Sequence, residues 1–314
     1  MPPSNDHLAL QPRIPAPTRK VEFDFSGLKV GCAEYEEGPT GCTVMLFQRG
    51  WAMAIDKRGG MVGTVGDFDW AHGLCFAGGS LLGLEAAAGV GGHLFAENGH
   101  STQQIPLVNG AIVWDYVNRA NTVHPDKALG RAAAAAAVEG IAPIGRVGAG
   151  RSATLGKLRF PAEPGGQGVA FGHFRDVRVL VLTVVNAVGA IIGRDGSVVA
   201  GNRNPATGER RRALNLLAAD YNGAPATAPT QNTTLTAVIT DAKMTSHQVA
   251  QFGRQVHTSM ARAIDPFHTA TDGDVLYAVT SNQAETQVSP DVLGMVASEV
   301  AWDAVLSVPE PGIG

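Results

Sequence analysis

The 314-residue chain contains few residues of the kinds that mark disulfide-rich, nucleic-acid-binding or membrane proteins. Its three cysteines, Cys32, Cys42 and Cys75, are odd in number and have no CxxC spacing, which argues against a disulfide framework and a zinc knuckle. The net charge of −4 supplies no basic field to attract nucleic acid. No stretch approaches the roughly 18 consecutive apolar residues of a membrane span. The sequence therefore predicts neither nucleic acid nor a membrane as partner.

Signals for export and for cofactors are also missing. The first twenty residues, MPPSNDHLALQPRIPAPTRK, lack the continuous apolar core of a signal peptide, so we expect residues 1–20 to form an extended arm and the protein to be cytoplasmic. GAGRSATLGKL has five residues between Gly150 and Gly156, whereas a phosphate loop has four. The sequence has no HExxH, and His257 and His268 are expected to be polar helix and loop residues rather than ligands. No metal or organic cofactor is predicted.

What is present is an ordinary globular composition, with 45% hydrophobic and 17% charged residues, which suits a large core. Hydrophobic patterning predicts strands and helices in groups rather than in strict alternation. The expected strands are 21–31, 42–50, 111–117, a pair within 176–192 turning near Asn186–Gly189, 235–239 and 272–282. The expected helices are 73–93, 124–140, 244–264 with Ser246 as N-cap, and 291–308. This order favours a layered α+β fold in which helices cover a two-sheet core.

The most informative stretch is QNTTL, residues 231–235. Residues 201–232 lose all periodicity and are interpreted as a flexible linker, yet a buried strand follows at once and begins on Thr233. An autoproteolytic N-terminal nucleophile requires this arrangement, because its hydroxyl attacks the preceding carbonyl, here that of Asn232. The freed α-amine, with an unperturbed pKa of about 7.7–8.0, can then act as a base. Spacing alone leaves open that two β-favouring threonines merely open a strand.

A second candidate is the Asp272-Gly273-Asp274 sequence. Such a sequence is typical of a turn capped by carboxylates. It also suits a carboxylate pair that orients a nucleophile or a proton. Residue types alone do not decide between the two readings.

Several motifs occur in one order along nearly the whole chain: FDFSGLKVG, YEEGPTG, HPDKALGRAA, QNTTL, QVHTSM, PFHT, DGD and ASEVAWDAVL. In this order they resemble the L-aminopeptidase/D-amidase/D-esterase and β-aminopeptidase family of N-terminal-nucleophile hydrolases, and within it the nylon-oligomer hydrolases. The resemblance implies an αββα sandwich of the autoprocessing aminopeptidase/ornithine-acetyltransferase type. It also implies self-cleavage between residues 232 and 233. The products would be an α subunit of residues 21–232, with the linker 201–232 at its end, and a β subunit of residues 233–314. These would form one composite domain, assembled into a homotetramer.

The resemblance assigns site residues by position: the nucleophile Thr233, the preceding Asn232, the acidic partners Asp272 and Asp274, Lys157 beside the threonine, and Asn186 for the oxyanion. Trp114 stands where family members tend to have tyrosine. Its indole N–H can donate a hydrogen bond but cannot exchange a proton, and core packing is an equally good interpretation.

The activity implied is hydrolysis of linear aliphatic amides, such as 6-aminohexanoate oligomers, in endo mode through an acyl-enzyme. Three alternatives stay open: an aminopeptidase or D-amidase releasing N-terminal α- or β-amino acids, an acyltransferase, and a non-catalytic oligomer.

Overall fold

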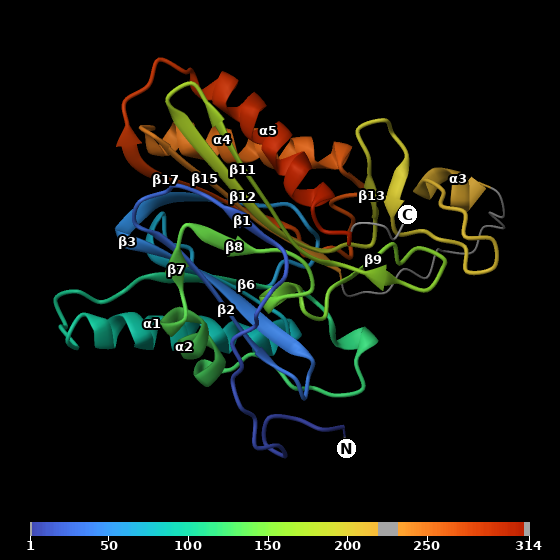
Figure 1. Cartoon of the computed structure of the whole chain (residues 1–314), viewed down its shortest axis with the longest axis horizontal. Coiled ribbons are helices and arrows are strands. Elements are labelled where there is room, and N and C mark those ends of the chain that lie inside the picture. Colours follow the sequence, from blue (N-terminus) through green and yellow to red (C-terminus); the bar gives the residue numbers. More distant parts are fainter. Residues whose placement is uncertain (1, 219–231, 311–314) are drawn as a thin grey trace.

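The computed structural model of the chain describes residues 2–218 and 232–310. Helices α4 and α5 cover one side of the molecule, α1 and α2 cover the other, and two layers of strands lie between them (Figure 1). The α-helices are α1 (Glu85–Glu97), α2 (Lys127–Ala135), α3 (Ala213–Ala218), α4 (Ser246–Ser259) and α5 (Pro290–Leu306). The predicted αββα sandwich is confirmed.

Most of the strands belong to one sheet that folds over on itself. The strands are β1 (Lys20–Glu22), β2 (Leu28–Tyr35), β3 (Thr40–Lys57), β4 (Thr64–Val65), β5 (Trp70–Ala77), β6 (Val108–Ile112), β7 (Val138–Glu139), β8 (Ile141–Pro143), β9 (Thr154–Leu155), β10 (Glu163–Pro164), β11 (Gly166–Phe174), β12 (Val177–Asn186), β13 (Ala190–Ile192), β14 (Val198–Ala200), β15 (Thr233–Ala242), β16 (Ile264–Asp265) and β17 (Val275–Ala284). The ten-stranded sheet runs β11-β12-β15-β17-β3-β5-β6-β4. In addition, β2 pairs with β3, and β7 pairs with β2.

The long strand β3 belongs to both strand layers. Its first half pairs with β2 and its second half pairs with β17. Between the halves its register with β5 shifts, and Arg49 and Gly50 have φ values of 62° and 77°. An irregularity of this kind bends a strand. The bend lets the chain continue from one layer into the other.

Three apolar layers hold the sandwich together. The core between the strand layers includes Leu28, Phe47, Leu182, Ile239 and Tyr277, all buried. A second layer joins β12, β15 and β17 to α4 and α5, and a third joins β2, β3 and β5 to α1 and α2. Every residue of β15 is buried, as expected for a strand with elements on both faces. This strand is antiparallel to β12 and parallel to β17.

Some predicted elements differ from those observed. Residues 73–93 are not one helix: β5 ends at Ala77, a 3₁₀ turn spans Ser80–Leu84, and α1 begins at Glu85. Alanine and glycine suit close packing in either element, so this composition hid the boundary. Thr245, not Ser246, is the N-cap of α4, because Thr245 forms a capping box with Gln248.

Pairing partners also departed from expectation. Residues 176–192 do contain two strands, but β12 pairs with β11 and β15 whereas β13 pairs with β14 and β16.

Residues 111–117 leave the sheet after Ile112, where β6 ends. The expected helix at 124–140 is shorter, since Asp126 caps α2 and the helix ends at Ala135.

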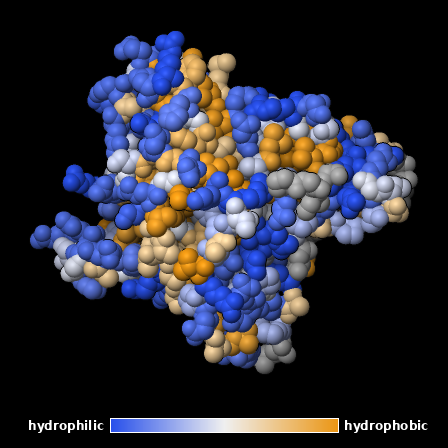
Figure 2. Space-filling model, viewed as in Figure 1, coloured by the Kyte–Doolittle hydropathy of each residue, from blue (hydrophilic) through white to orange (hydrophobic). Residues whose placement is uncertain are grey.

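The predicted linker is only partly described. Arg203 and Arg210 form an isolated bridge, and α3 follows it, so residues 201–218 contain local structure. Residues 219–231 lie outside the described residues. No helix in the described ranges is long and apolar enough to cross a membrane. On the face shown in Figure 2, hydrophobic residues gather in separate patches with hydrophilic residues between them.

Candidate active site

Thr233 begins β15 at a point where three segments meet. On one side its sheet partner is Asn186, the last residue of β12. On the other side, Asn232 forms a parallel bridge with Asp272, just before β17. Asn232 and Thr233 are both fully buried, with 0% exposure. The fold therefore brings together residues that are far apart in the sequence, and it does so around the peptide bond between Asn232 and Thr233.

The threonine hydroxyl lies against the carbonyl group of Asn232. Thr233 Oγ1 is 2.5 Å from the Asn232 oxygen, and the backbone N–H of Trp114 donates to Oγ1 at 3.2 Å. The backbone N–H of Gly273 donates to the same Asn232 oxygen at 2.8 Å. A fixed N–H at this place can stabilise negative charge that develops on the oxygen when the carbonyl carbon is attacked.

The two aspartates occupy different environments. Asp274 Oδ1 accepts the backbone N–H of Thr234 at 2.6 Å, so Asp274 anchors the residue that follows Thr233. Asp272 Oδ2 accepts the N–H and the hydroxyl of Thr269 at 2.9 and 2.6 Å. Burial, reinforced by the charge of Asp274, raises the pKa of Asp272 to about 6, although the Thr269 hydrogen bonds act in the opposite direction. Asp272 can therefore exchange a proton close to neutral pH.

Lys157 is buried beside Asn186. Its Nζ donates to the backbone oxygen of Asn186 at 2.9 Å and to Oδ1 at 3.0 Å. Burial lowers the pKa of Lys157 to about 7, against the opposing charges of Asp272 and Asp115. A lysine with a pKa near neutrality is partly uncharged at pH 7 and can accept a proton.

Asn186 and Trp114 act on the threonine through the backbone in this uncut chain. Asn186 Nδ2 donates to the backbone oxygen of Trp114 at 2.7 Å, and the N–H of Trp114 in turn donates to Thr233 Oγ1. The indole N–H of Trp114 donates to the backbone oxygen of Met61 at 2.7 Å. The predicted oxyanion role of Asn186 and the indole contact of Trp114 stay predictions.

Several residues of this region were not predicted from the sequence. Gly273 was noted only as the spacer of the paired aspartates, and its N–H contact depends on a strand register that one sequence does not reveal. Asp115 is buried and accepts hydrogen bonds from Ser152 Oγ and Arg119 Nη1, which fixes the chain next to Trp114. A charged residue within the apolar stretch AIVWDYV was the available signal. His268, which was expected to be a polar loop residue and is part of the PFHT motif, contacts Asp274.

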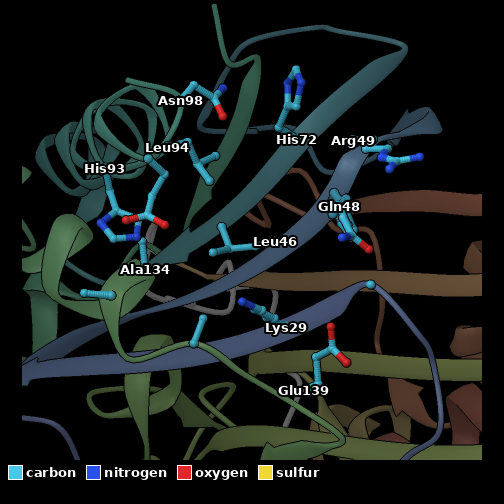
Figure 3. Close-up of a pocket in the computed structure, with 15 residues that line it drawn as sticks. Lys29, Leu46, Gln48, Arg49, His72, His93, Leu94, Asn98, Ala134 and Glu139 are labelled. Carbon is cyan, nitrogen blue, oxygen red and sulfur yellow. The ribbon is translucent and has the colours of Figure 1, made fainter. Parts of the chain in front are cut away.

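A cavity lies away from the residues around Thr233. It has a volume of about 600 Å³ and opens between the ends of α1 and α2 and strands β2, β3 and β5. Figure 3 shows Lys29, Leu46, His72, His93 and Glu139 around it. None of the site residues described above lines this cavity. Among the described residues, no group of three or more His, Cys, Asp or Glu side chains is placed to hold a metal ion.

Comparison with known proteins identifies the class. A 6-aminohexanoate-oligomer endohydrolase of Paenarthrobacter ureafaciens is 43% identical over 97% of this chain and 90% of that protein. An uncharacterized aminopeptidase of Mycobacterium bovis is 30% identical over 77% of this chain and 73% of its own length. The structure of the L-aminopeptidase D-Ala-esterase/amidase of Ochrobactrum anthropi, described as a new variant among the Ntn-hydrolase fold, superposes with a TM-score of 0.62 at 15% identity. The match covers 94% of this chain and 87% of that one.

The fold and these relatives define an enzyme, an amidohydrolase with the N-terminal-nucleophile-hydrolase fold. The family model of Peptidase family S58 matches residues 23–308, and the chain belongs to that family. The resemblance that the sequence motifs indicated is thereby confirmed.

Proposed function

We propose that this chain cleaves itself between Asn232 and Thr233 and then hydrolyses linear aliphatic amides, such as 6-aminohexanoate oligomers, at internal bonds. The observation that carries the proposal is the contact of the Thr233 hydroxyl with the Asn232 carbonyl, together with the Gly273 N–H on that carbonyl oxygen.

The self-cleavage balances as an acyl shift followed by hydrolysis. Thr233 Oγ1 attacks the Asn232 carbonyl carbon, and its proton passes to a nearby base, for which Lys157 has the suitable pKa. The C–N bond breaks, the nitrogen takes up the proton, and an ester links Asn232 to the threonine oxygen. Water hydrolyses the ester and leaves a free carboxylate on Asn232 and a free α-amine on Thr233.

Substrate hydrolysis repeats the same chemistry on an external amide. The Thr233 α-amine takes the hydroxyl proton, the oxygen forms an acyl-enzyme, and the protonated amine delivers the proton to the leaving nitrogen. Water then releases the acid. Asp274 holds the peptide after Thr233, and Asn186 holds Trp114, whose N–H points at Oγ1.

The preference for aliphatic amides is supported by relatives. The match to the endohydrolase covers 97% of the chain, whereas the match to the mycobacterial aminopeptidase covers 77% at lower identity. The paired aspartates 272 and 274 belong to the DGD motif, one of the motifs by which the sequence resembles the nylon-oligomer hydrolases. An alkyl chain has no side groups to recognise, so its site must work by apolar contact along a groove.

Blocking the amino end of an oligomer separates this function from the aminopeptidase alternative. We expect the processed protein to cut an N-acetylated 6-aminohexanoate tetramer internally, with products identified by mass spectrometry. An aminopeptidase needs the free terminal ammonium and would leave the capped oligomer intact. Loss of all activity on capped oligomers, combined with rapid release of residues from free peptides, would establish the alternative.

The composition of the mature protomer follows from the proposed self-cleavage. The mature protomer would consist of residues 21–232, preceded by the arm 1–20, and residues 233–314, joined in one composite domain. We further propose a homotetramer of such protomers in the cytoplasm. Light scattering of the purified protein measures the assembly directly.

A further inference from the structure

His268 lies in the loop before β17 and is fixed by packing. Its ring stacks on Phe267 with centroids 3.8 Å apart and meets the ring of His257 edge-on at 4.4 Å. Its backbone has a φ of 58°, in the left-handed region, and its side chain is 18% exposed. The two ring contacts and the low exposure indicate that its surroundings hold the side chain in place.

Both donors of His268 meet one oxygen of Asp274. The backbone N–H and the ring Nδ1 each lie 3.0 Å from Asp274 Oδ2. In the tautomer with the proton on Nδ1, the ring donates to this carboxylate oxygen beside the backbone N–H. Ring Nε2 has no hydrogen-bond partner among the described residues, so the described polar contact of the ring is with Asp274.

Asp274 carries this contact to the nucleophile. The carboxylate is completely buried, and its other oxygen accepts the N–H of Thr234 at 2.6 Å. A buried carboxylate with fewer donors would turn toward other partners, because an unpaired buried charge is costly. The hydrogen bonds from His268 therefore fix the orientation of the Asp274 carboxylate, and this orientation determines how Asp274 holds Thr234, the residue next to Thr233.

We propose that His268 is a positioning residue for Thr233: it fixes Asp274 so that Asp274 holds Thr234 and keeps the Thr233 hydroxyl aligned with the amide carbonyl. The inference rests on the proposed function of Thr233. Loss of the ring donor misplaces the nucleophile, and small misplacements of reacting groups reduce rates by about 10²-fold. Turnover and self-cleavage both slow, while KM changes little, because His268 acts on the nucleophile and not on substrate contacts.

The test compares His268→Asn with His268→Asp. Asparagine and aspartate have the same shape and both tolerate a positive φ, but asparagine keeps an N–H donor near the position of Nδ1, whereas aspartate has no donor there and adds a negative charge beside Asp274. His268→Gly, which removes the donor without adding charge, is measured beside them and should be impaired as well. His100 supplies the matched control, since it is exposed and has a φ of 60°. The same two substitutions there introduce the same side chains in the same backbone conformation, away from Asp274. Self-cleavage is measured at pH 8 by intact mass, and kcat and KM on a 6-aminohexanoate oligomer.

We expect His268→Asn to stay within about threefold of the parent in both rates, and His268→Asp to lose about 10²-fold in kcat and in self-cleavage with KM nearly unchanged. Equal rates for the two variants, whether both normal or both impaired, would overturn the proposal, as would a loss expressed in KM alone. Should His268→Asp fail to fold by circular dichroism, His268→Gly replaces it and the same readings apply.

Failure of this inference is distinguishable from failure of the proposed function. Thr233→Ala is measured in the same series. An uncut and inactive Thr233→Ala beside a normal His268→Asp leaves the function standing and removes only the role of His268. A fully active Thr233→Ala removes the function itself.

Discussion

At the scale of single residues, Thr233 and Thr234 have the same side chain in different surroundings. Thr233 Oγ1 contacts the Asn232 carbonyl oxygen and the Trp114 N–H, whereas Thr234 Oγ1 is buried with no hydrogen-bond partner among the described residues. The contribution of Thr234 to the site is its backbone N–H, which any residue except proline retains. Only the first hydroxyl is therefore placed for chemistry.

We accordingly expect Thr233→Ala to give a folded, uncut and inactive protein, and Thr233→Ser to process more slowly for want of the methyl group that restricts χ1. Thr234→Val should process normally, with a free energy of unfolding unchanged or raised by about 1 kcal/mol, because it removes an unpaired buried hydroxyl. Intact-mass analysis and urea unfolding measure these effects. If Thr234 proves essential and Thr233 dispensable, the nucleophile has been assigned one residue too early.

The acid–base groups predict a pH dependence. The pKa values of about 7 for Lys157 and about 6 for Asp272 both imply loss of a proton as the pH rises through neutrality. Uncharged Lys157 can accept the hydroxyl proton, so self-cleavage should accelerate between about pH 6 and 8 and then level off. The rate is followed by gel after a jump from pH 5. Lys157→Met should remain uncut across this range, and a pH-independent rate in the parent would argue against Lys157 as the base.

At the scale of elements, the loop 58–63 clamps the segment 272–274. The backbone N–H groups of Arg58 and Gly59 donate to the backbone carbonyl oxygen of Asp274. The backbone N–H of Met61 donates to the backbone carbonyl oxygen of Asp272. A Cβ on Gly59 would lie 2.3 Å from the backbone oxygen of Asp272 and 2.3 Å from the backbone nitrogen of Asp274. The two backbone segments could then not pack as closely as they do. The clamp therefore depends on glycine at this position.

From this contact we predict that Gly59→Ala slows self-cleavage by at least about tenfold, because the Gly273 N–H and the Asp274 carboxylate are displaced from the Asn232–Thr234 backbone. Gly91→Ala in α1 is the control: its Cβ would meet only Val108 Cγ2, at an ordinary 3.9 Å. The control should process normally and gain up to about 1 kcal/mol from helix propensity. Normal cleavage in Gly59→Ala would show that the clamp is not needed.

The same scale shows what the sequence could and could not predict. The strand after QNTT was predictable because its apolar run follows a segment without periodicity. Helix α4 was predictable from Val249, Phe252 and Val256, which are all buried. The strand within 73–77 was not, because alanine, glycine and leucine suit both helices and buried strands. The local pattern marked Thr233 and the paired aspartates as candidates, but their roles, and those of Lys157 and Asn186, came from the family resemblance. Only non-local strand register brings Asn186, Thr233 and Asp272 together, and the sequence does not reveal this register. The contact of His268 with Asp274 was not predictable for the same reason.

At the scale of the whole molecule, the proposed cut falls at the edge of a strand in the middle of the sheet. Strand β15 pairs with β12, which precedes the cut, and with β17, which follows it. Helix α5 also packs on β12, so the core between the two fragments is continuous. The apolar clusters on the two faces of β15 contain residues of both fragments, and cleavage removes none of these contacts.

The purified protein should therefore elute as one species under native conditions and separate into residues 1–232 and 233–314 on a denaturing gel. Intact masses identify the new termini at Asn232 and Thr233. Thr233→Ala should run as one chain in both experiments. A single intact chain with full activity in the parent protein would contradict the mechanism.

The central place of β15 has a consequence for the lifetime of the enzyme. The uncut chain folds as a single polypeptide, so the folding rate of the protomer is independent of protein concentration. A processed molecule that unfolds must bring two separate polypeptides together again, so its recovery becomes a second-order reaction in competition with aggregation. Recovery of the folded protomer from urea, measured by circular dichroism, should be efficient and independent of dilution for Thr233→Ala, and poor and dilution-sensitive for the processed protein. The lifetime of an active molecule would then depend on the height of its free-energy barrier to unfolding, because the separated fragments rarely refold into active enzyme.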